Sequence, residues 1–141
     1  MRYVCDAGVA TWFGLETAAE AALESRAMNH AVEKYFLDMH EKATQSYVAP
    51  KGVPVAEQNI GLKGHIQRSM PIFLTLRDGE GASLVTAMLP PTGGNEKSFR
   101  PIVVGPANAD PYSLHADAIG ALAKHFGLAL DPVRCYPYRR G

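Results

Sequence analysis

The sequence lacks several features that would assign a protein class directly. Only two cysteines occur in 141 residues, and neither Cys5 nor Cys135 sits in a C-x-x-C or other metal-binding spacing. No run of about 18 apolar residues is present, and the first residues lack the apolar stretch of a secretory signal. These absences predict a cytoplasmic protein with no membrane association, whose two cysteines are reduced and packed rather than bridged.

Charge of one sign and signature motifs are missing as well. Fourteen basic residues balance fourteen acidic ones, so the chain has no net field that would gather nucleic acid. The motifs G-x-S-x-G, H-E-x-x-H and G-x-G-x-x-G do not occur. No cofactor and no metal site is therefore expected, and the sequence leaves open whether the protein is an enzyme.

What the sequence does contain is the composition of a folded domain. Hydrophobic residues make up 47% and charged residues 20%, close to the averages of globular proteins. A chain of this length buries roughly two thirds of its unfolded surface in one core. We therefore expect one domain over residues 1–141.

The N-terminal half predicts a hairpin followed by a long helix. Residues 2–5 and 9–15 look like strands around the turn sequence "DAG". The segment Thr17–Glu20 fits a capping box, and no glycine or proline interrupts the chain from there to Gln45. Apolar residues recur at spacings of three and four, so one face of this helix should pack on a sheet. His30 and its charged neighbours are expected on the solvated face.

The C-terminal half predicts more strands and a second helix. In the segment 55–70, the first half reads as loop or short helix and residues 66–70 alternate like a strand. The runs "PIFLTLRD" and "ASLVTAMLPP" flank "GEG" as a hairpin in the middle of an antiparallel sheet. The remaining expected elements are a surface loop at 90–98, a strand at 99–105, a helix at 111–126 capped by Gly127, and a short last strand at 133–140.

This order of elements indicates the α+β class. We expect a mainly antiparallel sheet of about five to six strands, one long N-terminal helix and one C-terminal helix.

The junction before the second helix holds the first candidate site. Asp110 precedes Pro111 where a helix cap is expected, and His115 lies at the centre of the apolar stripe of this helix. A partly buried histidine near a helix N-terminus is an acceptor, base or ligand candidate near neutral pH. The simpler interpretation is a core histidine whose ring nitrogens are paired with neighbours.

A second candidate group combines His65 and Arg68 with Arg77 and Asp78. His65, Gln67 and Ser69 would share one face of the expected strand, and Arg68 or Arg77 would hold a carboxylate. The simpler interpretation is a half-exposed sheet face that meets solvent.

Two functional hypotheses follow from these residues. The first is a non-enzymatic module that binds a protein partner, a second copy of itself or a small ligand. The second is a small-ligand sensor or enzyme with a pocket between the sheet and the second helix around His115. In that pocket, His115 would be the titrating group and Arg68, Arg77 or Arg100 would bind an anion. The basic and aromatic residues at 134–141 raise a nucleic-acid role, but a C-terminal strand whose tyrosines pack on the sheet explains them more simply.

Overall fold

The computed structural model describes residues 1–91, 99–132 and 135. Along the chain, the elements are β1 (Arg2–Ala7), β2 (Ala10–Gly14), α1 (Ala18–Met28), α2 (Val32–Gln45), α3 (Val55–Ser69), β3 (Ile72–Arg77), β4 (Ser83–Leu89), β5 (Ile102–Val104), the 3₁₀ turn η1 (Pro106–Asn108) and α4 (Tyr112–Phe126). The strands form one antiparallel sheet in the order β1-β2-β3-β4-β5. The expected α+β class is confirmed, and the β3–β4 hairpin lies inside the sheet as predicted.

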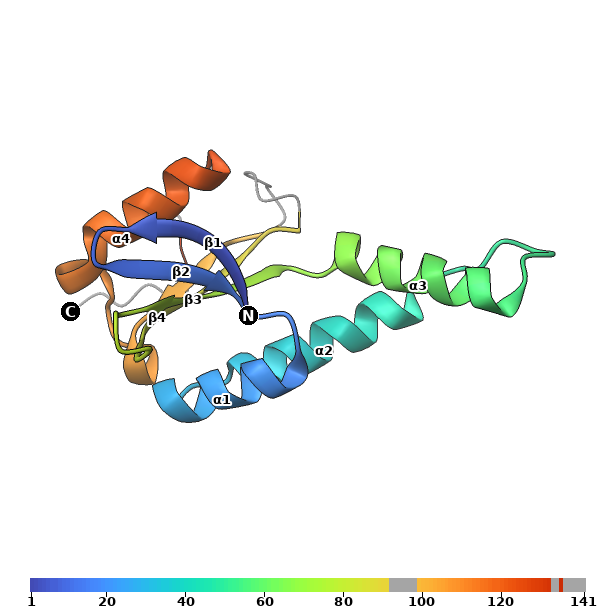
Figure 1. Ribbon diagram of the computed structural model, residues 1–141, viewed down its shortest axis with the longest axis horizontal. Helices are drawn as coiled ribbons and strands as arrows, with labels where there is room; N and C mark the ends of the chain where they lie inside the picture. Colours follow the sequence, from blue (N-terminus) through green and yellow to red (C-terminus); the bar gives the residue numbers. More distant parts are fainter. Residues whose placement is uncertain (92–98, 133–134, 136–141) are drawn as a thin grey trace.

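Helices cover both faces of the sheet, α4 on one face and α1 with α2 on the other (Figure 1). On the α4 face, Trp12 is fully buried, and its indole N–H donates to the Ala118 carbonyl oxygen at 2.8 Å. On the opposite face, Phe36 of α2 packs against Phe73 of β3 with ring centroids 5.1 Å apart. Side chains alternate between the faces along each strand, so both faces contribute to the core.

Local signals at the element ends are confirmed. The Thr17 side chain accepts from the Glu20 N–H, and the Glu20 carboxylate reaches back to the Thr17 N–H, which completes the predicted capping box. Gly81 takes a positive φ of 86° in the β3–β4 turn, and Gly127 ends α4 at a φ of 68°. Only residues without a Cβ adopt such angles at little cost.

The single long helix expected from Thr17 to Gln45 is wrong, because α1 and α2 are separate helices. Asn29 takes the left-handed conformation with a φ of 52° and caps the end of α1. Asparagine tolerates this region better than other non-glycine residues. The chain therefore turns at residues 29–31, and both helices lie against the sheet.

The strand expected at residues 66–70 is also wrong, because these residues end α3. This helix extends away from the sheet beside the end of α2 (Figure 1). A Cβ at Gly61 would lie 2.3 Å from the Tyr47 hydroxyl oxygen, so glycine at this position permits the close approach of the two segments. The helix that contains Gly61 and His65 continues through Ser69, so the local alternation of residues 66–70 does not produce a strand.

Near the C-terminus, Cys135 is buried in the α4-face core, and Cys5 packs against the same core. Both cysteines are free thiols. Most of the predicted loop at 90–98 and of the predicted last strand at 133–140 lies outside the described residues.

Candidate functional site

A buried carboxylate lies between α1 and the sheet. Glu24 is fully buried, and its Oε1 accepts from the Arg77 guanidinium at 3.2 Å and from the Ser83 hydroxyl at 2.7 Å. Its Oε2 accepts from the Thr86 hydroxyl. A buried charge is costly unless it is paired and its lone pairs are satisfied, and these three donors meet that condition.

The hydrogen-bonded chain continues from Thr86 to His30. His30 follows the left-handed Asn29, and its Nε2 lies 2.8 Å from the Thr86 Oγ1. On the other side of the ring, the Val32 N–H donates to Nδ1 at 3.4 Å. We call the series Glu24, Thr86 and His30 the relay. It connects α1, β4 and the α1–α2 junction.

The environment of His30 favours its neutral form. Burial of the ring lowers the pKa of His30 below its usual value, although an interaction with the backbone of His30 itself and the negative charge of Glu24 oppose the shift. A neutral imidazole has one donor and one acceptor nitrogen, and both already have partners here. His30 is therefore suited to hydrogen bonding near neutral pH rather than to carrying charge.

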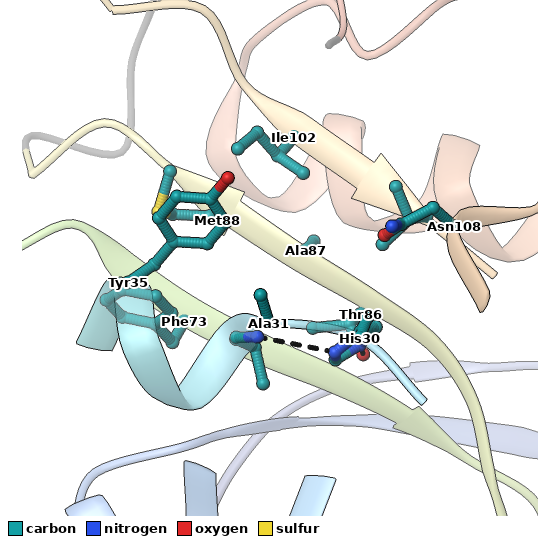
Figure 2. A pocket seen from close by; sticks show the side chains of 11 residues that line it. His30, Ala31, Tyr35, Phe73, Thr86, Ala87, Met88, Ile102 and Asn108 are labelled. Atoms are coloured by element: carbon teal, nitrogen blue, oxygen red, sulfur yellow. Dashed lines mark hydrogen bonds between the residues drawn. The ribbon is translucent and has the colours of Figure 1, made fainter. Parts of the chain in front are cut away.

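A cavity of about 270 Å³ opens beside the relay (Figure 2). It lies between the α1–α2 junction and the sheet face formed by β3, β4 and β5. Seven of the eleven lining residues are apolar, and polar groups come from His30, Tyr35, Thr86 and Asn108. The lining residues are His30, Ala31, Val32, Tyr35, Phe73, Thr86, Ala87, Met88, Ile102, Val104 and Asn108.

A strained turn forms the wall opposite His30 (Figure 2). Within η1, Ala107 and Asn108 both have positive φ, 55° and 60°. The Gly105 N–H donates to the Ala109 carbonyl oxygen at 2.8 Å and closes this turn. Two consecutive non-glycine residues in the left-handed region are uncommon, and such strain concentrates at functional sites. The turn places Asn108 at the edge of the cavity.

Of the six residues singled out from the sequence, Arg77 is the one that belongs to the Glu24 network. Asp110 is exposed, and its carboxylate accepts from the Tyr112 N–H at 2.8 Å, as a residue ahead of a helix often does. His115 is half-buried in the first turn of α4, on the other side of the sheet from the cavity. Arg100 is exposed just before β5.

The other two of these residues lie on α3. The His65 Nε2 is 2.8 Å from the Ser46 Oγ, and its ring lies 5.4 Å from the ring of Tyr47. Arg68 is exposed near the end of α3. Because this segment is a helix, His65, Gln67 and Ser69 do not share the strand face that the alternation indicated. The six residues are thus spread over α3, β3 and the ends of α4 and β5 rather than gathered in one site.

Sequence reasoning missed Glu24, Thr86 and Asn108, and it placed His30 on the solvated face. One signal for Glu24 was present, since it falls between the buried Ala21 and Met28 at helical spacing. Asn29 likewise marked a possible helix end directly before His30. No comparable local pattern points to Thr86.

No protein family, curated protein or solved structure matches this chain. Within the described residues, no three His, Cys, Asp or Glu side chains are gathered as a metal site would require. None of the helices in the described ranges has the length and apolar character to cross a bilayer. The functional argument therefore begins from the geometry of the cavity and the relay.

Proposed function

We propose that this protein is a small-molecule-binding domain whose ligand occupies the cavity beside His30. The observation that carries the proposal is a cavity with both apolar and polar lining residues, bordered by the relay on one side and by a strained turn on the other. Binding sites in proteins are typically concave and mostly apolar, with a few fixed polar groups. A buried relay that orients one cavity residue supports this assignment better than a purely structural role.

The size and polarity of the cavity indicate the kind of ligand. An engineered apolar cavity of about 150 Å³ holds benzene, so about 270 Å³ accommodates one or two rings. The described lining residues include no lysine, arginine, aspartate or glutamate. An uncharged aromatic or heteroaromatic compound fits these conditions, because a charged ligand would lose its hydration without gaining a counter-charge.

Amide chemical-shift mapping tests the proposal with a library of uncharged one- and two-ring compounds. We expect saturable shifts confined to the α1–α2 junction, β4, β5 and η1. Ala31 is exposed at the cavity wall, so Ala31→Trp should occlude the cavity and abolish the shifts. The matched control is His125→Ala on the exposed side of α4, which should leave binding unchanged. Shifts that map elsewhere, or that persist in Ala31→Trp, would overturn the proposal.

We also propose self-association through α3, because this helix is poorly covered within its own chain. None of the 15 residues of α3 is buried, and the Ile60 side chain is 73% exposed. A groove of about 810 Å³ runs between α3, α2 and the start of β3, and its apolar lining includes Leu37, Leu62, Ile66 and Met70. A lone helix of this length is marginally stable in water, so a second copy seated on this surface would stabilise it.

Sedimentation over a range of protein concentrations tests self-association. We expect twice the monomer mass for the wild type, and monomers for Ile60→Asp on α3 and for Leu37→Asp in the groove. Leu114→Asp is the control, because Leu114 is 84% exposed on α4 and its change should leave the dimer intact. A monomeric wild type at about millimolar concentration, or a dimer that survives both α3-region changes, would refute this second proposal.

A further inference from the structure

The hydrogen bonds of the relay can be oriented in only one way, because Thr86 has a single hydroxyl proton. Glu24 is ion-paired with Arg77, so its carboxylate accepts hydrogen bonds and donates none. The bond between Glu24 Oε2 and Thr86 must therefore use the single hydroxyl proton of Thr86. With that proton committed, the Thr86 oxygen offers only lone pairs to His30. The contact at 2.8 Å between Thr86 and the imidazole consequently requires a proton on Nε2 of His30.

This requirement determines the role of the other ring nitrogen. In a neutral imidazole with Nε2 protonated, Nδ1 carries a lone pair. Within the described residues, the donor to Nδ1 is the Val32 N–H at 3.4 Å, near the upper limit for a hydrogen bond. Both His30 and Val32 line the cavity, and the long contact leaves the Nδ1 lone pair weakly engaged.

We propose that Glu24, acting through Thr86, fixes His30 as a hydrogen-bond acceptor at Nδ1 and thereby selects ligands that present an O–H or N–H donor. This inference rests on the proposed binding function of the cavity. It assigns Glu24 and Thr86 as positioning residues and His30 as the specificity-determining contact. The ligand class narrows to uncharged ring compounds with a donor group, such as a phenol or a ring N–H.

The tautomer is measurable on the free protein by long-range ¹H–¹⁵N correlation of the imidazole signals. We expect His30 to show a protonated Nε2 and an unprotonated Nδ1. The exposed His125 in the same sample serves as an internal reference that averages both tautomers. A His30 protonated at Nδ1 in the wild-type protein would overturn the inference, whether or not any ligand binds.

Glu24→Gln should invert this tautomer. Arg77 and Ser83 would still donate to the oxygen at the Oε1 position, so the new amide NH₂ would face Thr86. Thr86 would then accept from the amide and donate its own proton to Nε2, which moves the imidazole proton to Nδ1. Thr86→Ser keeps a hydroxyl and should preserve the wild-type tautomer. Thr86→Val removes it, and should give a mixture even if Glu24→Gln fails to fold. An unchanged tautomer in both Glu24→Gln and Thr86→Val would refute the positioning role.

Phenol and anisole then test ligand selection, because they differ in the hydroxyl proton. Titration of the wild type should give phenol at least about fivefold tighter binding than anisole, the value expected for one neutral hydrogen bond. In Glu24→Gln this preference should vanish or reverse. Equal affinity for both probes in the wild type would overturn the selection. Failure of both probes to bind would overturn the proposed function and the selection with it, while the tautomer result on the free protein would still stand separately.

Discussion

Replacement of Arg77 by methionine would leave the Glu24 carboxylate buried without its counter-charge. Glu24 is fully buried, whereas the Arg77 side chain is 18% exposed and contacts Oε1 at 3.2 Å. Removal of one partner of a buried ion pair costs about 3–5 kcal/mol, because the other charge cannot regain its hydration. The hydroxyls of Ser83 and Thr86 still donate to Glu24, so we expect a loss near the lower end, about 3 kcal/mol. The free energy of unfolding of a native protein is usually about 5–15 kcal/mol, so this loss is large.

Urea denaturation gives this free energy directly. Trp12 is the only tryptophan and is fully buried, so its fluorescence reports unfolding, and the transition midpoint should fall while the m-value stays constant. The double variant Glu24→Gln/Arg77→Met should recover most of the loss, because the stranded group is then neutral. Arg2→Met is the matched control, since the Arg2–Glu16 pair is 54% exposed on both sides and should cost at most about 1 kcal/mol. An Arg77→Met loss below about 1 kcal/mol, or no recovery in the double variant, would refute the reasoning.

Three further outcomes follow from the structure. Burial lowers the pKa of His30 in the folded protein, so on acidification the unfolded chain takes up the proton at a higher pH than the folded chain does. The free energy of unfolding should therefore fall as the pH drops from the unfolded pKa, about 6.5, through the lower folded pKa. His30→Gln should flatten this pH dependence. Trp12→Phe removes the indole hydrogen bond to Ala118 and leaves a cavity, so we expect a loss of about 2–3 kcal/mol in the free energy of unfolding. Urea denaturation of this variant is followed by circular dichroism, because it lacks the only tryptophan, and a loss below about 1 kcal/mol would contradict the assigned contact. Ala107→Gly relieves the left-handed strain at a φ of 55°, so its melting temperature should equal or exceed that of the wild type, whereas Ala107→Val should melt several degrees lower.

The predictions that held rest on chemistry confined to neighbouring residues. Thr17 and Glu20 form their capping box within one helical turn, and Gly127 terminates α4 by its own φ. The hairpin around "GEG" needs only two apolar runs and a turn in which Gly81 takes a positive φ. Each of these features is determined by a few consecutive residues, so the sequence alone was sufficient to predict it.

The two incorrect elements depend on contacts between distant residues. Nothing next to Asn29 forbids a continued helix, yet the turn at 29–31 brings His30 to Thr86, 56 residues away along the chain. Residues 66–70 alternate like a strand, but they end the helix α3, whose Gly61 and His65 lie against Tyr47 and Ser46 just after α2. In both places tertiary contacts outweigh a weak local preference.

The same dependence explains why the candidate site was not predicted from the sequence. Glu24 alone would be a poor core residue, and His30 alone resembles a solvated side chain next to charged neighbours. Each is explained by its contact with Thr86, whose hydroxyl donates to Glu24 and whose oxygen lies 2.8 Å from Nε2 of His30. The left-handed Asn29 turns α1 into α2 directly before the lining residue His30, and the left-handed Asn108 lines the cavity from η1. The buried carboxylate of Glu24 reaches the lining residue His30 through Thr86, and this connection to the cavity is the strongest argument for the proposed ligand site.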